Sequence, residues 1–148
     1  MGKINYLRVL ISGMTAAVVF IVTEFFVEGL AGILWGINET SLVLELFPQS
    51  LPGGLCFHFL NLLNLLMVCI LLIWLYAALR PRFDAGPKTA LICAFFFWLT
   101  ELFFIMNLVN MNIFPWKLGL ISLIFNAIEL PVAALAGASI YQETASKK

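Results

Sequence analysis

The sequence predicts an all-α fold: a transmembrane four-helix bundle in a single domain that covers residues 1–148. Two observations support this prediction. Hydrophobic residues make up 63% of the chain and charged residues only 11%, whereas a soluble domain carries about 25% charged residues. The apolar residues also form four long runs, and a helix needs about 20 such residues to cross a bilayer. Lipid is therefore expected to be the main solvent of this chain.

The four apolar runs set the boundaries of the expected spans. The first span covers residues 9–27, with a helix that can extend to Trp35, and the second covers 55–79. The third covers 89–109 and the fourth covers 118–140. None of these runs alternates polar and apolar residues in the way that the strands of a membrane β-barrel do, so helices are expected in all four.

Basic residues indicate how the spans are oriented. Lys3 and Arg8 precede the first span, segment 80–88 carries three basic residues between the second and third spans, and Lys147 and Lys148 follow the fourth. Basic residues concentrate in loops on the cytoplasmic side of a membrane. Both termini and the middle loop are therefore expected to be cytoplasmic.

The longest connection, residues 36–54, is then expected on the outer side. Within it, the segment TSLVLELF, residues 40–47, starts with Thr and Ser, continues with several apolar residues and stops before Pro48. These are start and stop signals of a helix. The pattern predicts a short amphipathic helix that lies on the outer membrane surface.

Polar and ionisable side chains within the spans mark the candidate site, because such groups are costly in hydrocarbon and often functional. At 100° per residue, Glu24 and Glu28 share a face with Gly13 and other small residues, which favour close helix packing. Each span has such a small or polar face, so these faces are expected to point into the bundle. The candidate residues are Glu24, Glu28, His58, Asn61, Glu101, Asn107, Asn126 and Glu129.

The depths of these residues predict the shape of the site. A helix rises 1.5 Å per residue, which puts Glu28 and His58 near the outer membrane surface and Glu101 and Glu129 near the midplane. Residues 65–79 of the second span, in the inner half of the membrane, are apolar and aromatic. The sequence thus predicts a polar pocket that opens outward and narrows toward the midplane.

Several chemistries are not expected. The chain has no P-loop, dinucleotide-binding or nucleophile-elbow motif and no paired cysteines, so no catalytic residue is assigned. Its net charge of zero gives no reason to expect nucleic acid as a partner. A metal site is not expected either, because di-metal bundles use Glu-x-x-His motifs that are absent here. No cofactor is expected, although haem or pigment ligation by His58 together with a partner chain stays open.

The stretch ALRPRFDAGPKTAL, residues 78–91, resembles the corresponding loop of small four-helix bacterial inner-membrane proteins of uncharacterised function. The resemblance covers this loop and the start of the third span. It implies a multi-pass protein of the bacterial plasma membrane, and it brings no activity with it.

Two functions fit these features. In the first, the chain is a non-enzymatic accessory subunit of a larger membrane assembly, and its apolar faces contact lipid and a partner subunit. In the second, it is a small proton-coupled carrier or ligand-binding protein that acts as a homodimer and uses Glu24, Glu101, Glu129 and His58. Transporters usually contain two repeats that move against each other. This chain of 148 residues has no repeat, which favours the first function.

Overall fold

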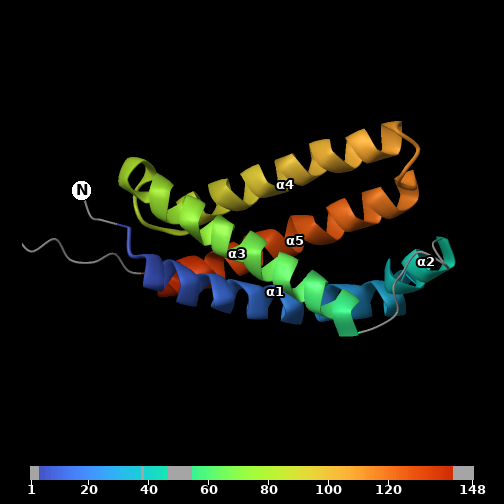
Figure 1. Cartoon of the computed structure of the whole chain (residues 1–148), viewed down its shortest axis with the longest axis horizontal. Coiled ribbons are helices and arrows are strands. Elements are labelled where there is room, and N and C mark those ends of the chain that lie inside the picture. Colours follow the sequence, from blue (N-terminus) through green and yellow to red (C-terminus); the bar gives the residue numbers. More distant parts are fainter. Residues whose placement is uncertain (1–3, 38, 47–54, 142–148) are drawn as a thin grey trace, which may run out of the picture.

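The computed structural model describes residues 4–37, 39–46 and 55–141, and within these ranges it contains helices and no strand (Figure 1). Four helices are long and apolar enough to cross a membrane: α1 (Tyr6–Trp35), α3 (Leu55–Phe83), α4 (Pro87–Asn110) and α5 (Trp116–Ile140). The all-α fold with four membrane-spanning helices is therefore confirmed, and the chain is a small multi-pass membrane protein.

Local interactions define the ends of α1. Asn5 caps its start, because the Asn5 Oδ1 atom accepts a 3.2 Å hydrogen bond from the backbone N–H of Arg8. At the other end Gly36 adopts a left-handed conformation with φ of 66°, which glycine tolerates, and its N–H bonds the carbonyl of Gly32. The helix is 30 residues long, so it exceeds the length that a bilayer requires.

A short helix, α2 (Glu39–Leu46), forms in the segment where the sequence predicts one. It contacts α5 and lies at the end of the bundle where α1 ends and α5 begins (Figure 1). Its position on the outer membrane surface stays a prediction. The remainder of the outer connection, residues 47–54, lies outside the described residues, as do Lys3, Lys147 and Lys148.

The turn between α3 and α4 is shorter than the sequence suggests. α3 continues to Phe83, four residues beyond the predicted end at Leu79, so Pro81 lies in the last helical turn. The hydroxyl of Thr89 lies 3.0 Å from the carbonyl oxygen of Phe83 and 2.8 Å from that of Asp84. These carbonyls have no partner within the helix, and sharing the Thr89 proton stabilises the longer helix end.

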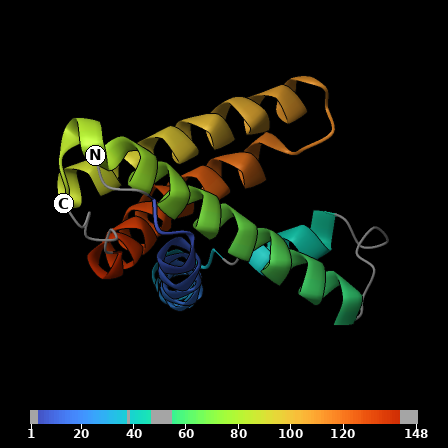
Figure 2. The ribbon, with the colours of Figure 1, turned by 60° about the vertical axis from the view of Figure 1, so that its left-hand side comes forward.

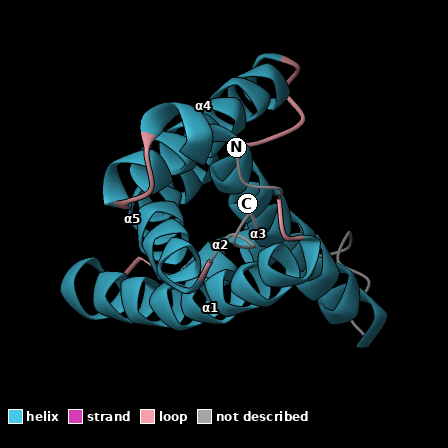
Figure 3. Cartoon of the chain, turned by 90° about the vertical axis from the view of Figure 1, so that its left-hand side faces the viewer, coloured by secondary structure: helices cyan, strands magenta, loops and turns pink. Residues whose placement is uncertain are grey.

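The long helices are arranged in the cyclic order α4, α5, α1, α3 (Figure 3). α5 packs extensively against both α1 and α4, and α1 packs extensively against α3, while α3 and α4 contact each other less. α3 crosses the bundle obliquely (Figures 1 and 2): it ends beside the start of α4, and its N-terminal half diverges from α4. The bundle is therefore most open between α3 and α4.

The start of α1, the end of α5 and the α3–α4 turn lie at the same end of the bundle. The backbone N–H of Asn5 donates a 3.3 Å hydrogen bond to the hydroxyl of Tyr141. The Tyr141 ring makes an edge-on contact with Tyr76 of α3, with 6.1 Å between the ring centroids, and the Arg80 guanidinium lies 5.7 Å from the Tyr141 centroid. Which side of the membrane this end faces stays a prediction.

Small residues allow the helices to pack closely in the core. A Cβ atom added at Gly13 would lie 2.8 Å from the Cα of Ile70, and one added at Gly137 would lie 2.9 Å from the backbone carbonyl oxygen of Ser12. Such contacts require glycine, as is common between membrane helices. The core of buried side chains is formed by α1, the C-terminal half of α3, the start of α4 and the C-terminal half of α5. It includes Ala16, Cys69, Leu72, Tyr76, Ala90, Cys93, Ala94 and Ala133.

Candidate functional site

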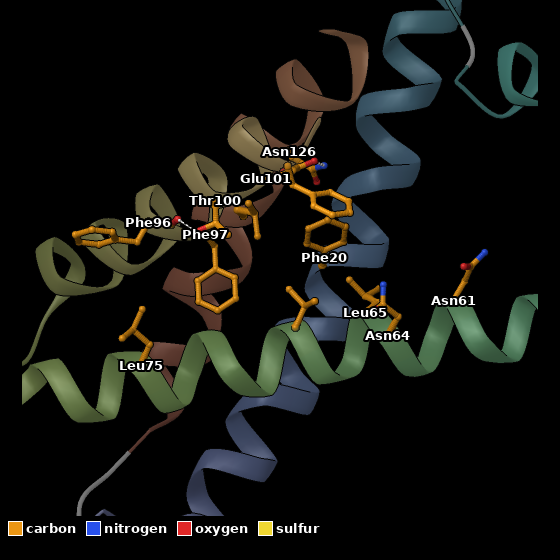
Figure 4. A pocket seen from close by; sticks show the side chains of 13 residues that line it. Phe20, Asn61, Asn64, Leu65, Leu75, Phe96, Phe97, Thr100, Glu101 and Asn126 are labelled. Carbon is orange, nitrogen blue, oxygen red and sulfur yellow. Dashed lines mark hydrogen bonds between the residues drawn. The ribbon is translucent and has the colours of Figure 1, made fainter. Parts of the chain in front are cut away.

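A cavity of about 650 Å³ lies between α3 and α4, and α1 and α5 contribute to its wall (Figure 4). We call it the α3–α4 cavity. Its volume is within the range of about 300–1,000 Å³ that is usual for ligand sites. Its polar lining consists of Asn61 and Asn64 from α3, Thr100 and Glu101 from α4, and Asn126 from α5.

Aromatic and aliphatic side chains form the rest of this cavity. Four phenylalanines line it: Phe20 of α1 and Phe96, Phe97 and Phe104 of α4. In Figure 4 the ring of Phe97 projects into the space between α4 and α3, and the ring of Phe20 lies next to Glu101. A mostly apolar wall with a few convergent polar groups is the usual composition of a small-molecule site.

A second cavity, of about 430 Å³, brings three acids together. It is lined by Glu24 of α1, Glu101 of α4 and Glu129 of α5, with Ser122 and Asn126 also on α5. We call it the acidic cavity. Glu129 is the most deeply buried of the acids, with only 3% of its surface exposed, whereas the side chain of Glu24 is exposed at the side of the bundle.

A hydrogen bond between α4 and α5 lies where the two cavities meet. The Nδ2 atom of Asn126 donates to the Oε1 atom of Glu101 over 2.6 Å, and both residues line both cavities. Phe20 and Phe104 also line both cavities, so these four side chains form a shared wall. A carboxylate that accepts a short hydrogen bond from an amide is held in one orientation.

The α4–α5 interface sets the position of Glu101 and Asn126. The indole Nε1 of Trp98 donates a 2.8 Å hydrogen bond to the carbonyl oxygen of Leu123. Trp98 and Leu123 each lie three residues before Glu101 and Asn126, which is about one helical turn. The two bonds together fix how α4 and α5 are placed against each other beside the cavities.

The structure brings five of the eight predicted site residues together. Glu24, Glu101, Asn126 and Glu129 line the acidic cavity, and Asn61 joins Glu101 and Asn126 in the α3–α4 cavity.

Three other predicted residues do not line either cavity. Glu28 is half-buried one turn beyond Glu24, and His58 and Asn107 are exposed. The expectation that the polar face of the second span points into the bundle does not hold for His58, because the N-terminal half of α3 diverges from α4.

The sequence reasoning missed the aromatic part of the site. It assigned no aromatic residue to the site, whereas Phe20, Phe97 and Phe104 line the α3–α4 cavity. Helical spacing offered a partial signal, because Phe97 lies four residues before Glu101 and Phe104 lies four residues after Thr100. Side chains separated by four residues share one face of a helix.

The described residues contain no group of three or more His, Cys, Asp or Glu side chains arranged to hold a metal ion, and this includes the acids of the acidic cavity. Cys69 and Cys93 are buried and not bonded to each other. The side chain of Cys56 lies outside the described part of the chain. The arrangement can therefore offer carboxylate, amide, hydroxyl and aromatic contacts to a ligand.

Comparison of the chain with protein-family models, with curated proteins and with solved structures finds no match in any of the three.

Proposed function

We propose that this protein is a non-enzymatic membrane protein that binds a small amphiphilic ligand within the bilayer, in the α3–α4 cavity. The observation that carries the proposal is the composition of that cavity. Phenylalanines and aliphatic side chains line most of it, and five polar residues, which include the hydrogen-bonded pair of Glu101 and Asn126, lie among them. An amphiphile could place its apolar body against the first group and its polar head group against the second.

The position of the cavity supports access from the bilayer. It lies between α3 and α4, the pair of neighbouring helices that contact each other least. Asn61 and Asn64 on α3 are exposed at its edge. An amphiphilic molecule dissolved in the bilayer could therefore enter between these helices, while its head group reaches Glu101.

The second candidate is the accessory subunit of a larger membrane assembly. Residues 58–64 at the start of α3 are all exposed, and His58, Asn61 and Asn64 among them are polar. Polar side chains that face lipid are costly, and a helix of a partner subunit, or of a second copy in a homodimeric carrier, would cover them. Under this candidate a defined partner, rather than a small molecule, contacts the α3–α4 opening.

Photolabelling tests the proposed function. The full chain in lipid nanodiscs is exposed to decyl probes that carry a photoreactive diazirine and a hydroxyl, ammonium or sulfonate head group. Ligand binding predicts that at least one probe labels segment 96–104 of α4 well above the exposed residues of α1. A cavity-filling substitution, Val68→Trp, should remove this labelling, because Val68 lines the cavity.

The matched control is Val22→Trp, which adds the same side chain to an exposed position of α1 and should leave labelling unchanged. Labelling that is equal at all lipid-facing positions and insensitive to Val68→Trp would contradict ligand binding. A stoichiometric partner that co-purifies in mild detergent and is lost when residues 58–64 are substituted would instead favour the accessory subunit.

A further inference from the structure

We infer that a groove between α4 and α5 binds an anionic phospholipid, with one acyl chain in the groove and the phosphate group beside Lys117. We call it the α4–α5 groove. It shares no described lining residue with the α3–α4 cavity, so this inference goes beyond the proposed function and does not depend on it.

The shape and lining of the α4–α5 groove suit an acyl chain. Its volume is about 280 Å³, slightly below the range of about 300–1,000 Å³ that is usual for drug-sized ligands. It extends from Asn110, the last residue of α4, back to Leu102, which is about 12 Å along the helix. Met106 and Leu120 in its lining are exposed, whereas Ile105 is buried. The groove is therefore an elongated and mostly apolar depression that faces lipid.

One end of the groove carries side chains that suit a lipid head group. Asn110 and Trp116, the first residue of α5, line this end. The Nζ atom of Lys117 lies 6.0 Å from the centroid of the Trp116 ring, and both side chains are exposed. Tryptophan is enriched at the level of lipid head groups. The ammonium, amide and indole N–H groups at this end are donors that phosphate and ester oxygens accept.

The position of Lys117 within the bundle is unusual. The other described basic residues, Arg8, Arg80, Arg82 and Lys88, belong to the opposite end, near the start of α1 and the α3–α4 turn (Figure 1). The rule that concentrates basic residues on one side of a membrane therefore does not account for Lys117.

The dipole of α5 also disfavours a lysine at this position. Lys117 is the second residue of α5, and the partial positive charge of a helix N-terminus repels a cation in the first turn. This turn, which is fully described, contains no acidic residue. The phosphate of a lipid in the groove would attract Lys117 and interact favourably with the helix end. An anionic lipid therefore offsets the unfavourable position, and a lipid without net charge offsets it less.

The experiment compares two photoreactive phospholipids that differ only in head group. Phosphatidylglycerol and phosphatidylcholine, each with the same diazirine-bearing acyl chain, are added in small amounts to nanodiscs of unlabelled phosphatidylcholine that contain the full chain. Labelling of Met106, Val109 and Leu120 is divided by labelling of the exposed residues 33–35 of α1 at the same end of the bundle. Phosphatidylglycerol should exceed phosphatidylcholine about fivefold in this ratio, because one basic residue at a membrane surface attracts anionic lipid by about that factor.

Two pairs of substitutions test the charge and the groove separately. Lys117→Gln should reduce the preference to less than about twofold, while Lys88→Gln, which removes an exposed basic residue at the opposite end, should leave it unchanged. Val109→Phe should lower groove labelling by both lipids, because Val109 lines the groove. Its matched control is Ile124→Phe, at an exposed position of α5 outside the groove, which should not lower it.

The outcomes that overturn the inference are distinct. Equal labelling by the two lipids, or a preference that survives Lys117→Gln, would show surrounding lipid only. A preference that appears only after Glu45→Gln also overturns it, since Glu45 of α2, a helix that contacts α5, would then be the partner of Lys117. Val68→Trp, which fills the α3–α4 cavity, should leave the preference unchanged, so the inference and the proposed function can fail separately.

Discussion

Asn126 of α5 donates a 2.6 Å hydrogen bond to Glu101 of α4, and both residues line the α3–α4 cavity and the acidic cavity. The bond joins two helices within the membrane-spanning part of the chain. It therefore links the stability of the bundle to the geometry of the candidate site.

Replacing Asn126 by leucine should destabilise the protein. The substitution removes the donor and leaves the Glu101 Oε1 atom without this hydrogen bond, and interhelical bonds in membranes contribute about 0.6–2 kcal/mol. Unfolding by a denaturing detergent in mixed micelles measures the change. Asn107→Leu is the matched control, because Asn107 is exposed on α4 and outside both cavities, and it should change stability by less than about 0.5 kcal/mol. Equal effects of the two substitutions would show that the bond to Glu101 contributes nothing.

Gly137→Ala should disrupt the packing of α5 against α1 and α3. The added Cβ would lie 2.5 Å from Ile73 Cδ1 and 2.9 Å from the backbone carbonyl oxygen of Ser12. The Ile73 side chain can move, but the backbone of α1 cannot move without a shift of the helix, so a loss of about 1–3 kcal/mol is expected.

The thermal unfolding temperature in detergent provides the measurement for this substitution. Gly29→Ala is the control, because no atom lies within 4 Å of the position of its Cβ. It should be neutral, or stabilising by up to about 1 kcal/mol, since alanine is the better helix former. Removing the Ile73 Cδ1 atom with Ile73→Val should relieve Gly137→Ala only in part. A Gly137→Ala protein as stable as the wild type would contradict the close approach of these helices.

Thr89→Val should weaken the connection between α3 and α4. The two side chains have nearly the same shape, but valine cannot donate to the carbonyls of Phe83 and Asp84. Because Thr89 is 1% exposed, the loss should be about 1–2 kcal/mol. Hydrogen exchange at the C-terminal end of α3 should rise as well. Thr15→Val is the comparison, since the Thr15 hydroxyl bonds the Ile11 carbonyl of its own helix, and it should leave that exchange unchanged.

The orientation of the chain can be tested by labelling single cysteines. In a variant without the native cysteines, Ala85→Cys marks the α3–α4 turn and Met111→Cys marks the α4–α5 turn, and both positions are exposed. The positive-inside rule predicts that an impermeant maleimide labels Met111→Cys on intact cells and labels Ala85→Cys only after permeabilisation. The reverse pattern would place the basic loop outside the cell and would contradict the predicted orientation.

Much of the fold could be predicted because span length and hydropathy are local properties. The runs at residues 9–27, 89–109 and 118–140 identified three of the helices to within a few residues at most ends. The end of α3 was missed, because Thr89 stabilises Phe83 across the turn and this contact depends on tertiary structure. A proline in the last turn of a helix also removes only one intrahelical hydrogen bond.

The candidate site could be predicted only in part. Helical periodicity places Asn126 on an inward face and Glu101 about a quarter-turn from one, and the structure joins the two residues by a hydrogen bond. Periodicity cannot show that α3 crosses the bundle obliquely, which leaves His58 outside both cavities and makes room for Phe97 in one of them. Crossing angles depend on where small residues such as Gly13 allow two backbones to approach, and hence on pairs of helices rather than on any single one.

The glycine contacts also determine which part of α3 can move. Ile70 packs closely against Gly13 and Ile73 packs closely against Gly137, so these contacts hold α3 in place near its middle. His58 lies twelve residues from Ile70, so the part of α3 between them is about 18 Å long. A tilt of α3 by about 10° about Ile70 would move the backbone at His58 by roughly 3 Å and leave Ile70 almost in place. The bundle should therefore widen at one end and stay rigid at the other, a difference that distances between spin labels at positions 62 and 109, with and without an amphiphile, would measure.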